Sequence, residues 1–322
     1  MKMRILGTGS SLPKNLVTND DLAKIMDTSD EWIRERTGIR SRHISTGETV
    51  VDLATDACLK ALENAGKKPE DVELILVATV SPEVSIPSAA CQVQAKLNAD
   101  NAAAFDINAA CSGFIFALTT ANAYIQSGMF KNALVVGAEV LSKIMDWNDR
   151  GTCILFGDGA GAVYVEADEN AENDFCSVIH SNGKKGVVLH CPTRDIKNPW
   201  YEQEETVKFV SMDGREVFKF AVSQVPLCLE EVLEKANITK DDVDMFVLHQ
   251  ANLRIISSIS KRYERGMEFF PCNMDRVGNM SSASIPVLLD ECHRNGTVKK
   301  GMKIAMAGFG AGLTYGAAVF TF

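Results

Sequence analysis

Residues 103–125 read AAFDINAACSGFIFALTTANAYI, and this stretch indicates a layered α/β fold. Residues 103–107 have strand character, while residues 114–125 are apolar almost all round, and Gly128 follows shortly after them. A helix that is apolar on every side is typical of the interior of a protein. We therefore predict a strand, a tight turn at Cys111 and a helix buried in the middle of the molecule.

Cys111 stands at the seam between that strand and that helix, with alanines before it and Ser112 and Gly113 behind it. Small neighbours leave a sulfur atom accessible, and a helix N-terminus lowers the pKa of a thiol. These features fit a nucleophile, but free cysteines are more often buried and inert. The stretch alone leaves both interpretations open.

The bulk composition indicates a globular enzyme of the cytoplasm. The chain has 322 residues, of which 46% are hydrophobic and 23% charged, and this balance is ordinary for a soluble protein. We find no long uncharged apolar stretch of the kind that spans a membrane, and the N-terminus has too short an apolar run for a signal peptide, so we expect no membrane association. A net charge of −9 disfavours nucleic acid as a partner.

The nine cysteines form an odd set without a CxxC pair, which argues against a disulfide framework and against a thiolate zinc site. His190–Cys191 and Cys292–His293 are adjacent pairs, and neighbouring side chains on a strand point to opposite faces. We therefore predict no metal site.

Strand-like runs at 73–79, 133–139, 244–249 and 303–308 alternate with helical segments. Their near-continuous hydrophobicity favours sheets buried on both faces. Residues 62–79 also align without a gap with residues 233–250. We call the constant shift in numbering that takes position 62 to position 233 the repeat offset.

At the repeat offset LVVG (134–137) falls on AMAG (305–308). Two matches at one offset favour a duplicated architecture of two similar halves packed face to face. We predict an N-terminal half at 1–170 and a C-terminal half at 171–322, with the boundary in the charged stretch 166–175.

His249 and Asn279 are the other candidate catalytic residues. His249 ends a predicted buried strand, where catalytic groups of α/β sheets gather, although a lone histidine is more often held by local hydrogen bonds. Asn279 is predicted to follow a strand and precede a helix, as Cys111 does, and taken singly it is better explained as a helix cap. The glycine-rich runs 156–163 and 308–318 do not spell a dinucleotide motif but could bare N–H groups for an oxyanion.

Five motifs of this chain, in this order and spacing, resemble the β-ketoacyl-acyl-carrier-protein synthase III family, and the resemblance covers essentially the whole chain. The motifs are TSDEWIRERTGIRSRH (28–43), NAACSGF (108–114), LHQAN (248–252), GNMSSASIP (278–286) and GFGAGLTYGA (308–317). The resemblance implies a thiolase-like fold with two duplicated βαβαβαββ halves, each with a five-stranded sheet, in an α-β-α-β-α arrangement. It also implies a homodimer.

For the reaction, the resemblance implies an acyltransferase that starts fatty acid biosynthesis. An acyl-CoA primer and malonyl-acyl-carrier protein would condense with loss of CO2. Cys111 would carry the acyl group, His249 and Asn279 would assist the condensation, and the backbone N–H groups of Cys111 and Ala311 would hold the oxyanion. The reaction needs no metal and no organic cofactor, since the coenzyme A thioester is a substrate.

The resemblance also implies three sets of substrate contacts. Coenzyme A would be bound by Thr28, Trp32, Arg36, Arg150, Gly214, Phe218 and Asn252. The carrier protein would be bound by Gln250, Ala251, Asn252, Leu253, Arg254, Lys219, Lys261 and Arg262, with Arg265 predicted on the same helix face as Arg254 and Lys261. Ile86 would enter the primer pocket of the partner subunit.

Two residues depart from the family pattern, in which Thr is usual at the position of Met280 and Gly at that of Ala311. Met280 could reshape the acyl pocket, and Ala311 would be strained at a positive φ. Three other functions stay open at this point. They are a specialised relative that makes an alkylquinolone or polyketide starter, a catalytically silent carrier-binding subunit, and a cysteine hydrolase.

Overall fold

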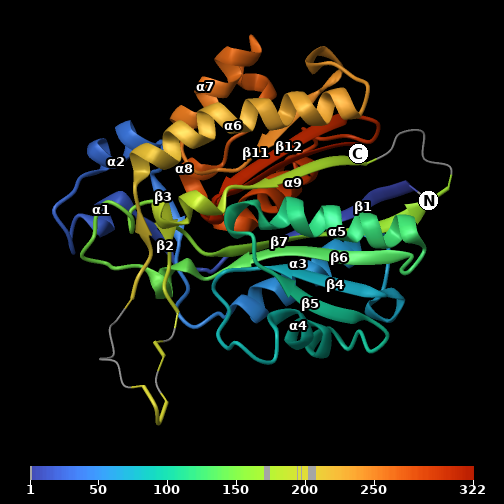
Figure 1. Ribbon diagram of the computed structural model, residues 1–322, viewed down its shortest axis with the longest axis horizontal. Helices are drawn as coiled ribbons and strands as arrows, with labels where there is room; N and C mark the ends of the chain where they lie inside the picture. The colour runs from blue at the N-terminus through green and yellow to red at the C-terminus, as the bar shows by residue number, and fades with distance from the viewer. Residues whose placement is uncertain (1, 170–174, 194, 197, 202–207) are drawn as a thin grey trace.

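The computed structural model of the chain describes residues 2–169, 175–193, 195–196, 198–201 and 208–322. These residues form two central β-sheets with helices on both sides of each (Figure 1). Within the described ranges no helix is both long enough and apolar enough to cross a membrane. All nine cysteines are free, as their spacing predicted.

The first sheet has five strands in the order β1-β7-β6-β4-β5. Its strands are β1 (Lys2–Ser11), β4 (Leu74–Ala78), β5 (Ala103–Ile107), β6 (Asn132–Glu139) and β7 (Gly159–Asp168). β4 is parallel to β5 and β6, whereas β7 is antiparallel to β6 and β1. β4 and β6 are buried along their whole length, which explains the continuous apolar runs that predicted them.

The second sheet repeats this order but has four strands, β11-β12-β13-β8, in the described part of the chain. Its strands are β8 (Cys176–Ser181), β11 (Met245–Leu248), β12 (Lys303–Gly310) and β13 (Thr314–Thr321). At the repeat offset, β6 falls on β12 residue for residue and β4 falls on β11.

The expectation of five strands in the second half is wrong for the described residues. At the repeat offset, β5 falls on the short helix α8 (Met274–Val277). The polar residues Asn273, Asp275 and Arg276 interrupt the apolar pattern there, so this segment does not form a buried strand. Residues 170–174 of the predicted boundary stretch 166–175 lie outside the described residues, so the boundary between the halves stays a prediction.

Five layers follow from the way the helices cover the sheets. The helices α3 (Val50–Ala65) and α4 (Ala89–Leu97) pack on the outer face of the first sheet, and α6 (Gly214–Lys235) and α7 (Leu253–Tyr263) pack on the outer face of the second. The helices α5 (Gly113–Ser127) and α9 (Ser284–Arg294) lie between the sheets and share one apolar core with both of them (Figure 1). The predicted α-β-α-β-α arrangement is therefore confirmed.

The helix α5 is the buried helix that the opening stretch predicts. It ends at Gly128, which has a φ of 76° and therefore closes the helix in the left-handed conformation. Gly113 begins the helix, and a Cβ there would lie 3.0 Å from the Ala78 Cβ, so glycine allows close packing against β4. The apolar surface of α5 faces two sheets at once, which is why it shows no polar side in sequence.

Short helices, strands and turns complete the described part of the chain. The short helices and strands are α1 (Asn19–Leu22), α2 (Asp30–Thr37), β2 (Leu16–Thr18), β3 (Ser41–His43), β9 (Leu189–His190) and β10 (Ser211–Met212). The 3-10 turns are η1 (Pro69–Asp71), η2 (Ala110–Ser112), η3 (Leu141–Ile144), η4 (Gly183–Val188), η5 (Lys240–Asp242), η6 (Met267–Phe269), η7 (Ser281–Ala283) and η8 (Ala311–Leu313).

Candidate active site

Cys111 lies in the turn η2, where the chain leaves β5 and enters α5. Ala110 before it has a φ of 47°, a left-handed conformation that few non-glycine residues adopt. The Ser112 hydroxyl secures the turn, because its Oγ lies 2.8 Å from the Ala109 carbonyl oxygen and 2.8 Å from Thr314 Oγ1 of the other half. The predicted strand, turn and buried helix are confirmed.

Burial governs the state of the Cys111 thiol in the free chain. The residue is only 8% exposed, and burial raises the thiol pKa to about 12. The Ser281 side chain opposes this rise, whereas the nearby Glu139 carboxyl would add to it in its ionised form. The lowering expected from the helix N-terminus therefore does not prevail, and the thiol is protonated at neutral pH.

His249 follows β11 directly, as predicted, and its backbone N–H donates to the Ala307 carbonyl at 2.9 Å. The side chain is 2% exposed and packs edge to face against Phe309. Burial lowers the imidazole pKa to about 3, so the ring is neutral at physiological pH. Its Nδ1 atom has no hydrogen-bond partner among the described residues.

Asn279 does not follow a strand, because α8 occupies the preceding residues. Its backbone instead forms an isolated parallel bridge with Phe156, through hydrogen bonds to Leu155 and Gly157. The Ser281 backbone N–H donates to Asn279 Oδ1 at 2.8 Å. This bond orients the amide, and it leaves the donor atom Nδ2 for the cavity beside it.

Cys111, His249 and Asn279 line one cavity of about 360 Å³ between the two halves. They arrive from η2, from the end of β11 and from the loop before η7, which are far apart in sequence. A nucleophilic sulfur, a neutral imidazole and an amide donor thus face the same small space. This arrangement can form an acyl thioester and stabilise negative charge on an oxygen next to it.

The same cavity extends to most of the residues predicted to bind coenzyme A. Trp32, Arg36, Gly214, Phe218 and Asn252 line it together with the three candidate catalytic residues. The Asn252 side chain caps α7 and donates to the Arg36 carbonyl at 3.0 Å. The cavity therefore runs from Cys111 towards α2 and the start of α6.

Thr28 and Arg150, the other two predicted contacts, do not line the cavity itself. The Arg150 guanidinium carbon lies 5.0 Å from the centre of the Trp32 ring, and that of Arg36 lies 4.3 Å from it. Thr28 Oγ1 is buried without a hydrogen-bond partner in the described chain. The mouth of the cavity thus combines an aromatic face with two cations.

A second cavity of about 630 Å³ meets the first at Cys111. It is lined by apolar side chains that include Leu141, Met145 and Phe156, and by the loop from Val80 to Ser85. Ile86 follows this loop and is 86% exposed, so in a single chain its side chain contacts little.

Ala311 lies at the predicted oxyanion site without the strain that its side chain suggested. It does not have a positive φ, and the left-handed position falls on Gly312, with a φ of 129°. Gly310 is the residue that space restricts, because a Cβ there would lie 2.6 Å from the Cys111 nitrogen. The substitution by alanine at 311 is therefore accommodated without strain.

Met280 does not reshape the acyl pocket, contrary to expectation. Its side chain is fully buried and packs with Leu12, Val277, Ala283 and Val287, away from both cavities. Met280 directly precedes the turn η7, and its sulfur atom lies beside Gly159 of β7.

The predicted carrier contacts divide into two groups. Arg254, Lys261 and Leu253 are exposed and line a groove of about 390 Å³ between α2 and α7, beside the mouth of the active-site cavity. Gln250 is fully buried and hydrogen-bonds the backbone of Leu248 and Asn273, so it cannot be a surface contact, and this prediction was wrong. Ala251 is only partly exposed.

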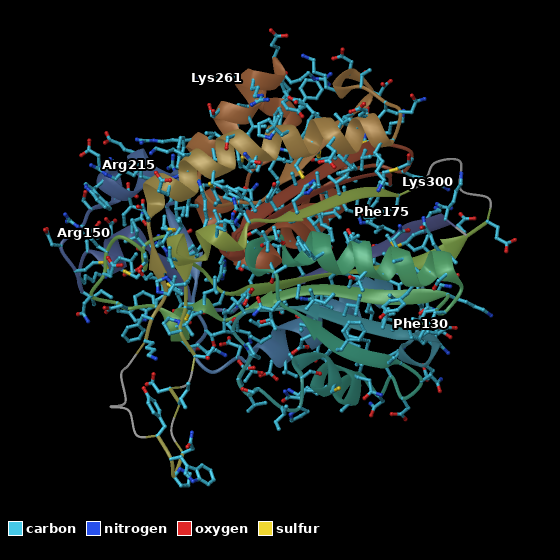
Figure 2. All side chains as sticks on the ribbon, viewed as in Figure 1. Phe130, Arg150, Phe175, Arg215, Lys261 and Lys300 are labelled. Atoms are coloured by element: carbon cyan, nitrogen blue, oxygen red, sulfur yellow. The ribbon has the colours of Figure 1, made fainter. Side chains whose placement is uncertain are left out.

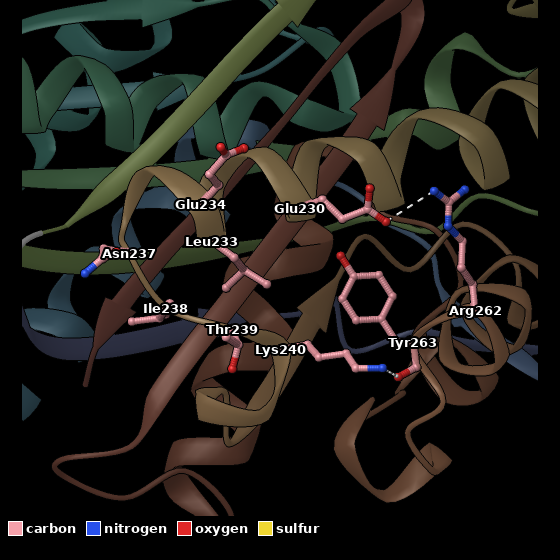
Figure 3. Close-up of a pocket in the computed structure, with 9 residues that line it drawn as sticks. All are labelled: Glu230, Leu233, Glu234, Asn237, Ile238, Thr239, Lys240, Arg262 and Tyr263. Carbon is pink, nitrogen blue, oxygen red and sulfur yellow. Dashed lines mark hydrogen bonds and ion pairs between the residues drawn. The ribbon is translucent and has the colours of Figure 1, made fainter.

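The remaining basic residues are engaged elsewhere. Lys219 pairs with Glu216, and Arg262 pairs with Glu230 in a separate open groove between α6 and α7 (Figure 3). Arg265 lies beyond the end of α7, where it pairs with Asp241 and stacks on Phe269. The prediction that Arg265 shares a helix face with Arg254 and Lys261 was therefore wrong.

Three residues of the site were missed from the sequence, namely Glu139, Ser281 and Ser282. The Ser281 side chain lowers the pKa of both Cys111 and Glu139, and Ser282 hydrogen-bonds Glu139. A signal for the serines was present, because the repeat offset aligns Asn108-Ala-Ala-Cys with Asn279-Met-Ser-Ser. No signal marked Glu139, since an acidic residue at the end of a strand is usually solvated.

The duplicated layered fold and the cysteine, histidine and asparagine in one cavity define a condensing enzyme of the thiolase type. Models of 3-oxoacyl-[acyl-carrier-protein (ACP)] synthase III and of its C-terminal region match residues 105–183 and 233–322. The chain belongs to the 3-oxoacyl-[acyl-carrier-protein] synthase III family.

Individual relatives agree over nearly the whole chain. The β-ketoacyl-[acyl-carrier-protein] synthase III of Clostridium acetobutylicum is 50% identical over 98% of this chain and 98% of its own. That of Caldanaerobacter subterraneus subsp. tengcongensis is 48% identical over 98% of this chain and 96% of its own. The crystal structure of 3-oxoacyl-[acyl-carrier-protein] synthase III from Aquifex aeolicus VF5 covers 99% of this chain and 100% of its own with a TM-score of 0.93 and 44% identity. The predicted fold, family and enzyme class are confirmed.

Proposed function

We propose that this enzyme condenses an acyl-CoA primer with malonyl-acyl-carrier protein, releasing CO2 and coenzyme A and forming a 3-oxoacyl-carrier protein that starts fatty acid synthesis. The observation that carries the proposal is the single cavity in which Cys111, His249 and Asn279 meet beneath the Trp32 mouth. Family membership supports the same reaction. Nothing in this chemistry calls for a metal or an organic cofactor.

In the first half-reaction Cys111 Sγ bonds to the carbonyl carbon of the primer thioester. The C–S bond to coenzyme A then breaks, and the thiol proton ends on the departing coenzyme A sulfur. The backbone N–H groups of Cys111 and Ala311 would hold the transient oxyanion. Because the resting thiol has a pKa of about 12, its proton leaves as the carbonyl is attacked and not beforehand.

In the second half-reaction the malonyl carboxylate leaves as CO2, and its electron pair forms an enolate. A neutral His249 N–H and the Asn279 Nδ2–H group would stabilise the enolate oxygen. The enolate carbon then bonds to the acyl carbon, and the Cys111 sulfur leaves and regains a proton from solvent. The neutral state of His249 and the orientation of the Asn279 amide support these roles.

The mouth of the cavity fits the adenine end of coenzyme A. A nucleobase would stack on Trp32 in place of one of the two arginines that now lie near the ring, and the arginines would then face the phosphates. The pantetheine arm would pass Gly214, Phe218 and Asn252 to reach Cys111.

We further propose a homodimer in the cytoplasm. Ile86, next to the loop that borders the second cavity, is 86% exposed, and Trp200 is 90% exposed. Large apolar side chains so exposed favour a second subunit, with Ile86 reaching the primer pocket of its partner. The nine free cysteines support a reducing compartment.

The test of the function is mass spectrometry of the protein after incubation with a panel of acyl-CoAs, followed by addition of malonyl-acyl-carrier protein. We expect an acyl mass on Cys111 and then a 3-oxoacyl-carrier protein. No acyl mass with any primer would indicate a silent subunit. Acyl release without malonyl consumption would indicate a hydrolase, and use of another acceptor would indicate a specialised relative.

Charge reversal of Arg254 and Lys261 together (R254E/K261E) should weaken the use of malonyl-acyl-carrier protein much more than acyl-CoA loading. Both residues line the groove beside the cavity mouth and would meet an acidic carrier. Exposed pairs contribute about 1 kcal/mol or less each, so we expect a fall of about tenfold in kcat/KM for the carrier substrate. The two half-reactions are measured separately.

The matched control reverses Lys299 and Lys300 (K299E/K300E), which are exposed just before β12 (Figure 2 labels Lys300, far from Lys261). This variant changes the net charge equally and should leave both half-reactions unaltered. Equal loss of both half-reactions in R254E/K261E, or loss in neither, would count against a docking surface at α7.

A further inference from the structure

The turn that carries Cys111 has a twin in the C-terminal half. The turns η2 and η7 are related by the repeat offset, and Ala110 and Ser281 begin them with the same φ of 47°. Each turn leads directly into one of the two buried helices, α5 and α9. Cys111 in one turn corresponds to Ser282 in the other. The backbone turn that carries the nucleophile in the N-terminal half is therefore present in the C-terminal half as well.

The two copies differ in the residue that ends the neighbouring strand. In the active copy β12 ends at Gly310, which packs on Cys111 and has no side chain, so the cavity stays open. In the other copy β6 ends at Glu139, the counterpart of Gly310 at the repeat offset, and its Oε1 lies 2.9 Å from Ser282 Oγ. A buried carboxyl group thus stands beside the serine where the active copy leaves room beside the cysteine.

The hydrogen bonds around Glu139 indicate a protonated carboxylic acid. Ser282 Oγ lies 2.8 Å from the Ala78 carbonyl oxygen and 2.9 Å from Glu139 Oε1, but a hydroxyl has one proton and a carbonyl can only accept. Both bonds form only if Ser282 donates to Ala78 and accepts a proton from Oε1. The other oxygen, Oε2, accepts from the Val80 N–H at 3.1 Å, from Ser81 Oγ at 2.5 Å and from Thr79 Oγ1 at 3.2 Å.

The surroundings of Glu139 agree with this state. Glu139 has no exposed surface, and burial raises the pKa of its carboxyl above the ordinary value. Glu139 pairs with Gly159 in the first sheet. Asp158, the residue before Gly159, accepts hydrogen bonds from the backbone N–H groups of Ser45 and Ser142. The Glu83–Lys143 pair lies on the adjoining loops, and the Cys111 thiol lies on η2.

Ser281 links Glu139 to the two reacting groups. Its backbone N–H donates to Asn279 Oδ1, and its side chain is close enough to Glu139 and Cys111 to lower the pKa of both. We propose that Glu139 is a positioning residue of the condensation, a neutral carboxylic acid that fixes the Ser281–Ser282 turn and so aligns the Cys111 thiol and the Asn279 amide. Its neutrality matters because an ionised carboxylate there would oppose negative charge on Cys111.

The proposal rests on the proposed roles of Cys111 and Asn279, but its main tests need no substrate. The variant Glu139→Gln keeps a neutral donor and acceptor of the same shape, whereas Glu139→Ala leaves the Ser81, Val80 and Ser282 groups without their partner. The control is Glu63→Gln, which makes the same chemical change on the exposed side of α3.

The first readout is the infrared difference between wild type and Glu139→Gln at neutral pH. We expect the carbonyl band of a protonated carboxylic acid, absent from the difference for Glu63→Gln. The bands of an ionised carboxylate would overturn the proposal. This measurement does not depend on catalysis, so it separates a failure of this proposal from a failure of the proposed function.

The second readout is alkylation of Cys111 by iodoacetamide from neutral to moderately alkaline pH, followed by mass spectrometry. Glu139→Gln should react within about threefold of wild type near neutral pH, and faster than wild type as the pH rises and Glu139 ionises. In Glu139→Ala, the rates at which Cys111 is alkylated and acylated should differ about tenfold from the rates in Glu139→Gln. A ratio of Glu139→Gln to wild type that stays flat or falls with pH would contradict the proposal.

The pH dependence of stability tests the direction of the Glu139 pKa shift independently. It needs only wild type and Glu139→Gln, so it still applies if Glu139→Ala does not fold. A carboxyl whose folded pKa is raised stabilises the fold fully below its unfolded pKa, near the ordinary 4.5, and this contribution is lost as the pH rises through the folded pKa. The Tm of wild type relative to Glu139→Gln should therefore fall as the pH rises above about 5. A rise instead would mean that Glu139 is ionised in the fold.

Discussion

The variant Cys111→Ala is expected to lose primer loading and overall condensation completely, by about 10⁴-fold or more, while it keeps the fold. Sγ is the atom that forms the thioester in the proposed reaction, and among the described residues that line the cavity beneath Trp32 no other carries a thiol. The change removes one buried atom from the junction of two cavities, so the structural cost is small. Intact-protein mass spectrometry after incubation with acyl-CoA measures the loading.

A cysteine elsewhere on the chain provides the control. Cys91→Ala alters an exposed thiol on α4 and should load the primer as wild type does. Thermal unfolding of both variants verifies that the fold persists. If Cys111→Ala still carried the acyl mass, the nucleophile would be another residue and the proposed function would fall with it.

The variants Asn279→Ala and His249→Ala should lose CO2 release from malonyl-acyl-carrier protein by about 10² to 10³-fold each, because each removes a donor aimed at the enolate. Acyl transfer from acyl-CoA to Cys111 should stay measurable in both, since the proposed oxyanion donors of that step are backbone groups. His249→Ala should lose more of the loading than Asn279→Ala if the imidazole also receives the thiol proton.

The pH profile adds a further check on His249. Burial lowers the pKa of this imidazole to about 3, and a neutral ring is the donor form in the proposed reaction. Protonation of His249 therefore should not slow CO2 release by wild type near pH 6.5, where an ordinary histidine titrates. An acid limb with a midpoint at that ordinary value, lost in His249→Ala, would contradict the burial of this side chain.

Two separate assays, of labelled primer on protein and of labelled CO2 released, distinguish the half-reactions. Asn101→Ala, an exposed asparagine between α4 and β5, is the matched control and should behave as wild type in both. Near-normal CO2 release by Asn279→Ala and His249→Ala would mean that both residues are structural. Their roles would then be the helix cap and the locally bonded histidine that the sequence left open.

Most of the fold could be predicted because the buried strands are continuous apolar runs and the central helix is apolar all round. The repeat offset even predicted which strands correspond, since β6 and β12 coincide in their bounds once the shift is applied. The absence of a fifth strand from the described part of the C-terminal half could not be predicted from the duplication. Polar residues around α8 prevent a buried strand there. A match between two halves at a constant offset does not reveal such local differences.

The candidate site could be predicted in its residue types but not in its electrostatics or its side-chain directions. A helix N-terminus suggested a lowered pKa for Cys111, yet burial outweighs it, and burial depends on packing between the halves. Whether Met280 faced a cavity depended on the path of η7, and the burial of Gln250 depended on contacts with Leu248 and Asn273. Burial and side-chain direction depend on contacts between distant segments, so the local sequence does not predict them.

The meeting of the two cavities at Cys111 sets the order of events in turnover. If the primer's acyl chain points into the cavity beside Met145, the cavity beneath Trp32 must admit coenzyme A first and the carrier's arm afterwards. Two long substrates then cannot be bound at once, and catalysis proceeds by a ping-pong sequence. Released coenzyme A competes with the incoming carrier for the same passage. A higher concentration of free coenzyme A in the cell therefore inhibits the first step of chain synthesis.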